Sequence, residues 1–148
     1  MVKKEKVSDS SDTKLKVFKG VAWFAGLYHI LLGLIGTFAP TGLVLSIVSG
    51  VFGVVPTASD QFFYLTKFIS AYMIAFGFML VLMAREPKKY SIFVWPAVTM
   101  FGIRIFDRIV FFDLLNSAFG STMLMNMRTI IPISILILIF IYTRPKNN

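Results

Sequence analysis

The sequence predicts an all-α membrane protein, a four-transmembrane-helix bundle with a short interfacial or re-entrant helix between helices 1 and 2. Its 148 residues are 57% hydrophobic and have a mean hydropathy of +0.78, whereas roughly half of an ordinary soluble domain is apolar. The apolar residues fall in long blocks, and a helix that crosses a membrane needs about 20 of them in a row. Short basic segments separate several of these blocks, so both length and spacing favour a polytopic bundle.

The N-terminal part combines a polar tail with the first span. Residues 1–17 are polar and charged and have no apolar period, which predicts a disordered basic cytoplasmic tail. Residues 18–38 predict the first span, and this block is too long for the apolar core of a signal peptide, so it indicates a signal anchor. Pro40 ends the helix. Small side chains recur along the span and let a second helix approach closely, namely at Ala22, Gly26, Gly33 and Gly36.

The rest of the chain predicts one irregular segment and three further spans. Residues 41–58 are apolar but interrupted by glycines and by Pro56, which favours an interfacial or re-entrant helix over about 42–51. The further spans are expected at about 61–84, 91–114 and 123–142.

The distribution of lysine and arginine predicts the orientation of the helices. Segments 39–60 and 115–122 contain neither residue, whereas the two tails and the turn at 85–89 are basic. Basic loops stay on the cytoplasmic side, so both termini are expected in the cytoplasm, with a transmembrane domain over residues 18–143 and a C-terminal tail over 144–148. The same clusters account for the net charge of +8, and no nucleic-acid partner is expected.

The third span contains ionisable residues, which are costly in hydrocarbon and are rarely left facing lipid. At about 1.5 Å per residue, Arg104 lies about 9 Å from the outer end of its helix, and Lys67 and Arg128 come to roughly 8 Å on theirs. We expect these charges to form one layer in the outer part of the bundle, with a surplus of positive charge. The candidate ligand-binding residues are this layer together with the single, deeper histidine: Lys67, Arg104, Asp107, Arg108, Arg128 and His29.

Three interpretations of the charged layer stay open. The first is an interhelical cluster of ion pairs and hydrogen bonds that fixes the order of the helices. The second is an outward-facing polar pocket for a carboxylate, a lipid phosphate or a quinone carbonyl, because arginine suits bidentate anions. The third is a path for protons or small molecules, as in a transporter, although the inner half of the spans carries no charge.

Enzyme chemistry finds little support in the residues. There is no cysteine, and the single histidine, His29, excludes bis-histidine haem within one chain and has no co-ligands for a metal. The sequence shows no nucleophile–base pair, glycine-rich phosphate loop or acidic dyad. We therefore expect no catalytic residues and no bound metal or cofactor, and His29 is either a hydrogen-bonded core residue or part of a ligand site.

Three stretches are similar to known proteins. They are residues 31–40 (LLGLIGTFAP), residues 71–87 (AYMIAFGFMLVLMAREP) and the region around Arg104. Together they resemble the DoxX-like and BphX-like families of small four-helix integral membrane proteins of bacteria. The resemblance covers about residues 18–143. It implies a location in the bacterial cytoplasmic (inner) membrane, and no catalytic residue of either group matches a residue of this chain.

The resemblance also implies two kinds of function. Some DoxX-like proteins are small membrane subunits linked to quinone-dependent sulfur oxidation, and BphX-like proteins are named for an aromatic-degradation gene context. We therefore expect a non-enzymatic accessory subunit, or a binder of a lipid, quinone or small anionic ligand. Its expected partners are the lipid bilayer and either another membrane protein or a second copy of the chain. The alternative is a membrane subunit of a quinone-linked oxidoreductase.

Overall fold

The computed structural model describes residues 2–145, with their side chains from residue 12 onward, and this part of the chain contains helices and no strand. The prediction of an all-α fold is therefore confirmed. The long helices are α1 (Val2–Phe38), α3 (Asp60–Arg85), α4 (Val94–Val110) and α6 (Met123–Thr143). The short ones are α2 (Thr41–Phe52), α5 (Phe112–Phe119) and the 3₁₀ turn η1 (Ser91–Phe93).

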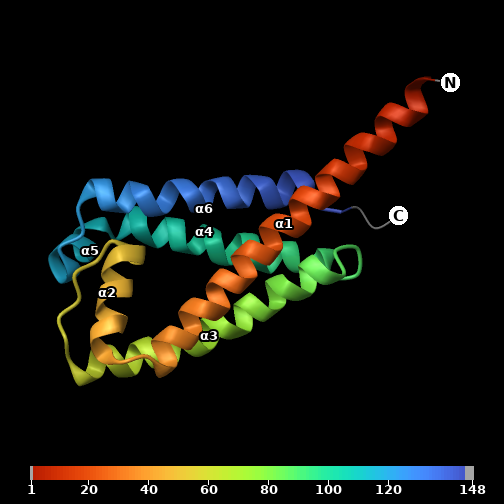
Figure 1. Ribbon diagram of the computed structural model, residues 1–148. Coiled ribbons are helices and arrows are strands. Elements are labelled where there is room, and N and C mark those ends of the chain that lie inside the picture. Colours follow the sequence, from red (N-terminus) through yellow and green to blue (C-terminus); the bar gives the residue numbers. More distant parts are fainter. Residues whose placement is uncertain (1, 146–148) are drawn as a thin grey trace.

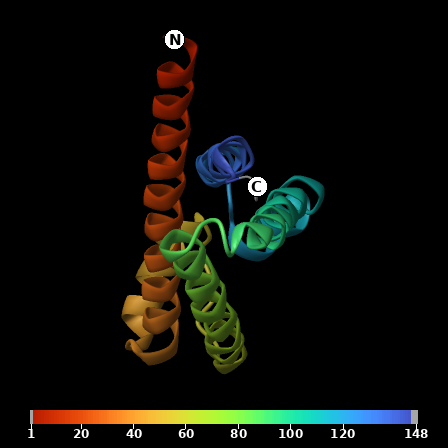
Figure 2. The same ribbon diagram turned by 90° about the vertical axis from the view of Figure 1, so that its right-hand side faces the viewer.

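The long helices form two pairs that diverge from one end of the molecule. α1 lies along α3, and α4 lies along α6 (Figure 1). The pairs meet where α6 ends, and there the rings of Phe18 and Phe140 contact each other with centroids 5.8 Å apart. Toward the opposite end the pairs separate (Figures 1 and 2), and α2 reaches from the end of α1 toward α5 and α6 (Figure 1). The fold is therefore a wedge with a closed end and an open end.

Glycine allows α1 and α3 to pack backbone against backbone. A Cβ atom added to Gly77 would lie 2.7 Å from the carbonyl oxygen of Gly26, and one added to Gly33 would lie 2.8 Å from that of Ser70. Gly36 also packs against Ser70. The small-residue surface expected on the first span is present, and its partner is the second long helix. Such close approach favours van der Waals packing, which drives helix association where the surroundings are apolar.

Three of the described helices are long and apolar enough to span a membrane: Asp12–Phe38 within α1, Asp60–Arg85 and Met123–Thr143. The region expected to form one further span, 91–114, is instead divided. The 3₁₀ turn η1 leads into α4, and α4 ends at Val110 before α5 begins. Phe111 at the break has φ −104° and ψ 29°, away from helical values. No glycine or proline marks this break, so the sequence carries no local signal for it.

The N-terminal segment also differs from the expectation. Residues 1–17 were expected to form a disordered tail, but α1 begins at Val2 and extends well beyond the other helices (Figure 1). The segment contains no proline and no glycine and is rich in lysine, a good helix former, so it can continue the helix that the apolar part forms. Residue 1 and residues 146–148, the end of the expected C-terminal tail, lie outside the described part.

Candidate functional site

A cavity of about 290 Å³ occupies the open part of the wedge. Four helices contribute to its wall: α1, the end of α2, α4 and α6. Four of its lining side chains are also exposed, Phe24 and Tyr28 on α1 and Arg128 and Pro132 on α6. The cavity therefore reaches the surface between α1 and α6. Its remaining lining is mostly apolar, and a few polar groups converge in it, as is typical of small-molecule sites.

His29 is held rigidly at the inner wall. Its side chain is 4% exposed and packs against the rings of Phe76 and Phe101, with centroid distances of 5.0 Å and 5.8 Å. Its Nδ1 lies 2.7 Å from the carbonyl oxygen of Ala25. Because a carbonyl only accepts, Nδ1 carries the hydrogen and donates it, which leaves Nε2 of the neutral ring as an acceptor. His29 thus joins α1, α3 and α4 and presents a lone pair toward the cavity.

Arg104 uses this acceptor. It lies on α4, and its Nη1 is 3.4 Å from Nε2 of His29, a long hydrogen bond. The guanidinium also lies over the ring of Phe52, with 5.9 Å between its carbon atom and the ring centroid. A guanidinium has five N–H donors, and no carboxylate among the described residues forms an ion pair with Arg104. Most of its hydrogen-bonding capacity is therefore available to a molecule in the cavity.

α6 supplies a second arginine and two further polar groups. Arg128, Thr129 and Pro132 lie on one face of the helix and line the cavity. Pro132 has no N–H, so the carbonyl of Arg128, four residues earlier, loses its normal helical donor. The hydroxyl of Thr129 donates to the carbonyl of Met125 at 3.4 Å. This wall therefore offers a cation and a hydroxyl oxygen, and the backbone carbonyl of Arg128 has no helical donor.

The cavity is cationic. Its lining includes two arginines and neither aspartate nor glutamate. Asp107 precedes Arg108 on α4, yet its side chain is exposed and does not line the cavity. Within residues 12–145, Lys89 and Glu86 form an ion pair at 3.1 Å in the turn after α3. In this part of the chain, no acidic side chain of the charged layer forms one. The positive charge in the cavity is therefore not neutralised by the protein.

Arg108 has a structural role. Its Nη2 donates to the carbonyl of Phe52 at 2.8 Å, and its Nη1 donates to Oδ1 of Asn126 at 3.2 Å. Asn126, which is 2% exposed, returns a hydrogen bond from Nδ2 to the backbone carbonyl of Arg108 at 2.9 Å. The last carbonyls of a helix lack intrahelical partners, so Arg108 satisfies the end of α2 and fastens it to α4 and α6.

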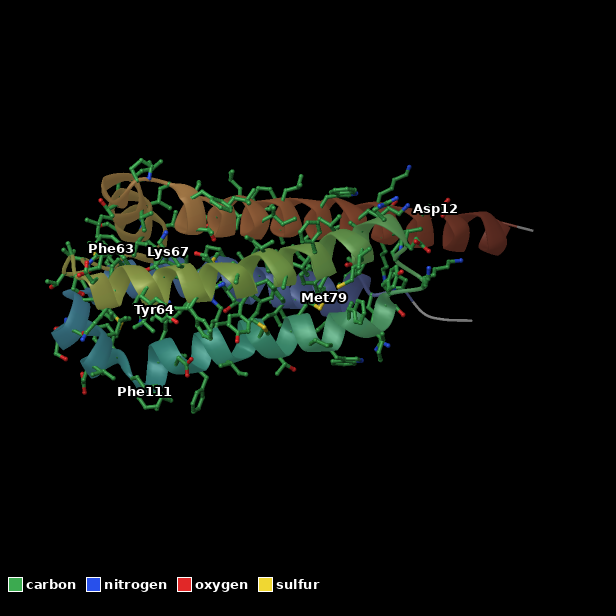
Figure 3. All side chains as sticks on the ribbon, turned by 90° about the horizontal axis from the view of Figure 1, so that it is seen from below. Asp12, Phe63, Tyr64, Lys67, Met79 and Phe111 are labelled. Carbon is green, nitrogen blue, oxygen red and sulfur yellow. The ribbon has the colours of Figure 1, made fainter. Side chains whose placement is uncertain are left out.

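Lys67 has a similar role at the end of α1. Its Nζ donates to the carbonyl of Thr37 at 3.1 Å, one of the last carbonyls of that helix. It lies on α3 near the end at which α1 and α2 join, opposite to the end marked by Asp12 (Figure 3). The cation also complements the negative end of the helix dipole. Lys67 is absent from the cavity lining.

The structure thus divides the six candidate residues into two groups. His29, Arg104 and Arg128 line one cavity, whereas Lys67, Arg108 and Asp107 do not. Of the interhelical cluster considered from the sequence, the ion pairs do not form among these residues, whereas interhelical hydrogen bonds do, because Lys67 and Arg108 donate to backbone carbonyls and to Asn126 in place of carboxylates. Sequence reasoning did not single out Tyr28 or Phe52 as lining residues. Neither carries a local signal, since an aromatic residue in an apolar block is ordinarily read as an interface anchor or as packing.

The fold and the site together define a class: an all-helical protein with three helices apolar enough to span a membrane and a cationic cavity between helix pairs. Among the described residues, no group of three or more acidic or histidine side chains could hold a metal ion. No family model matches the chain, and comparisons with curated proteins and with solved structures find no similar protein. The resemblance to the DoxX-like and BphX-like families stays a prediction.

Proposed function

We propose that this chain is a non-enzymatic integral membrane protein that binds the anionic group of a small amphipathic molecule, a carboxylate or a phosphate. The observation that supports it is the cavity lined by Arg104 and Arg128 and by no carboxylate. Arginine forms bidentate, charge-assisted hydrogen bonds with both kinds of anion. The cationic surplus expected in the outer layer is thereby concentrated on two side chains.

The membrane arrangement that we propose has four crossings. Besides the three long helices, η1 and α4 together span 20 residues, Ser91–Val110, or about 30 Å at about 1.5 Å per residue, which matches a hydrocarbon core of about 30 Å. α1 begins and α6 ends at the same end of the molecule (Figure 1), as four crossings require. With the basic segments inside, both termini are cytoplasmic, the membrane is the bacterial inner membrane, and α2 lies at the outer interface.

This arrangement explains why the ligand should be amphipathic. The cavity reaches the surface between α1 and α6, and in a membrane that surface faces lipid. A molecule that partitions into the bilayer can enter there and place its charged group beside Arg104, where phenylalanine rings exclude water. Charged interactions are stronger in such a setting than in water. His29 acts as a positioning residue, because it fixes the guanidinium of Arg104 through Nε2.

The experiment is a titration of the purified protein in neutral nanodiscs, followed by calorimetry and corrected with empty nanodiscs. Octyl phosphate and octanoate are the anionic probes, octanol is the neutral one, and inorganic phosphate tests for an anion without a chain. We expect the anionic amphiphiles to bind more tightly than octanol. Hydrogen bonds to charged groups contribute about 1.5–3 kcal/mol, so Arg104→Gln or Arg128→Gln should weaken anion binding about 10- to 100-fold.

The matched control is Arg85→Gln. Arg85 is an exposed arginine at the end of α3 and does not line the cavity, so its loss should leave the affinities unchanged. Equal affinity for octyl phosphate and octanol would overturn the proposal. Equal losses in Arg85→Gln and Arg104→Gln would overturn it as well, since a non-specific attraction to a basic protein would explain both.

A quinone is the second candidate ligand, and with it a subunit of a quinone-linked oxidoreductase. The observation in its favour is the aromatic lining, which includes Phe24, Phe52 and Phe101 beside the donors of Arg104. A flat ring can stack on such side chains while a donor meets its carbonyl. A short-chain benzoquinone that competes with octyl phosphate in the same nanodiscs, and loses affinity in Arg104→Gln, would favour this reading.

A further inference from the structure

A second cavity lies on the other side of α2. It has a volume of about 270 Å³, is lined by α1, α2 and α3, and reaches the surface at the exposed Ile69. Its lining is almost wholly apolar and contains no charged side chain. Representative residues are Leu32 on α1, Val44 and Val48 on α2, and Ile69 and Met73 on α3.

The two hydroxyl groups in this lining already use their hydrogen atoms. Thr66 donates to the carbonyl of Phe62 at 2.8 Å, and Ser70 donates to the carbonyl of Thr66 at 2.7 Å. A polar ligand would therefore find no free donor and no charge here, and it would lose hydrogen bonds to water on entry. Hydrocarbon has no such penalty. The chemistry of this cavity thus selects an alkyl or prenyl chain.

Phe52 lines both cavities. On the polar side its ring lies below the guanidinium of Arg104, and its carbonyl is held by Arg108. The end of α2 is therefore fixed, and Phe52 is a wall residue that the cationic cavity and the apolar cavity share. Side chains change rotamer readily compared with helices, so a ligand can pass Phe52 without displacing α2.

We infer that the ligand is a single-chain acidic amphiphile, whose anionic head lies at Arg104 and Arg128 and whose hydrocarbon chain extends past Phe52 into the apolar cavity. The inference rests on the proposed function and names the ligand class for the same site. Each cavity alone is slightly smaller than the range for small-molecule sites, about 300–1,000 Å³, whereas the two together lie well inside it. One apolar cavity accommodates one chain, which favours an alkyl phosphate or a fatty acid over a two-chain phospholipid.

The test compares chain lengths in neutral nanodiscs, again after correction with empty nanodiscs. In the unmodified protein, and with affinities referred to the ligand concentration in the bilayer, hexadecyl phosphate should bind about tenfold more tightly than octyl phosphate, because its longer chain makes van der Waals contacts in the apolar cavity that the octyl chain does not make. Val48→Phe fills part of the apolar cavity, so it should remove this gain and leave octyl phosphate binding unchanged. Leu43→Phe is the matched control, since Leu43 is on the same helix, is 47% exposed and does not line the cavity.

A second measurement locates the chain directly and does not depend on a variant. Hexadecyl phosphate with a photoreactive diazirine at its far end should label Val48 or Met73, with the labelled residue identified by fragmentation of each peptide in the mass spectrometer. Labelling of the exposed surface of α3 at Phe68 or Tyr72 would overturn the inference. So would a chain-length gain that survives in a folded Val48→Phe protein, or equal affinity for dipalmitoyl phosphatidic acid and hexadecyl phosphate.

The outcomes separate the two proposals. If octyl phosphate binds, depends on Arg104 and shows no gain on lengthening, the head site stands and the inference about the chain fails. If octyl phosphate binds no better than octanol, the proposed function itself fails, whatever the longer ligand does.

Discussion

The contact between α1 and α3 differs from the contact between α1 and the α4–α6 pair in both distance and chemistry. Along α3, glycines bring the backbones of the two helices into direct contact at Gly26, Gly33 and Gly77. Toward α4 and α6, the same helix presents Tyr28 and His29, which line a cavity together with two arginines. Small side chains thus make one interface tight, and large polar ones hold the other open. α1 therefore packs against α3 with one face and lines the cavity with another.

The largest effect is expected where the tight interface is disturbed. In Gly77→Ala, the new Cβ atom would meet the carbonyl oxygen of Gly26 at 2.7 Å and the amide nitrogen of Ile30 at 2.8 Å. Backbone atoms cannot rotate away, so α1 and α3 must move apart. We expect the free energy of unfolding to fall by about 3 kcal/mol. This loss outweighs the roughly 1 kcal/mol by which alanine stabilises a helix relative to glycine. Thermal unfolding in detergent measures it.

Gly102→Ala is the matched control for that prediction. Gly102 lies within α4, and a Cβ atom added there would meet nothing within 4 Å. It should leave stability unchanged or raise it by up to about 1 kcal/mol. Similar losses of stability in both variants would mean that the backbones of α1 and α3 are not in direct contact at Gly77.

The next effect concerns the attachment of α2 to the open side. Asn126→Ala removes the acceptor of Arg108 and the donor to its backbone carbonyl, both in a buried position. Buried groups that lose their partners cost about 1–3 kcal/mol. We expect the free energy of unfolding, measured by thermal unfolding, to fall by that amount. Hydrogen exchange in α2 should also become faster, because Arg108 is no longer held in place to donate to the carbonyl of Phe52.

Asn116→Ala provides the comparison. Asn116 is exposed and donates one hydrogen bond, to the carbonyl of Ser121 at 3.0 Å, so its loss should cost about 1 kcal/mol or less. It should not change exchange in α2. Unchanged exchange in Asn126→Ala would show that Arg108 and Asn126 do not hold that helix.

The sequence predicted the scaffold better than the site. Block length and hydropathy identified the helical fold, and the spacing of Gly26, Gly33 and Gly36 identified the face on which α1 packs. These features follow from local chemistry, because a helix places residues three and four apart on one face. The helix end at Pro40 follows from the missing N–H and the fixed backbone of proline in the same way.

The site depends on how the helices tilt, and this information is not local. Depth along each helix placed Lys67, Arg104 and Arg128 at one level, but depth does not say which way a side chain points. The divergence of the two pairs separates Lys67 from the arginines and brings Phe52 next to Arg104. The break between α4 and α5 at Phe111 could not be predicted from the sequence either, because no glycine or proline lies there.

The smallest predicted effect is also the one that tests this separation. Lys67→Met removes a cation that caps the end of α1 at the carbonyl of Thr37, and such a cation stabilises a helix by about 0.3–1 kcal/mol. We expect a stability loss of that size and no change in octyl phosphate affinity, and Lys67→Arg should restore the stability. A loss of affinity in Lys67→Met as large as that in Arg104→Gln would show that the cations of the outer layer act as one site. The division between helix-capping and cavity-lining cations would then be wrong.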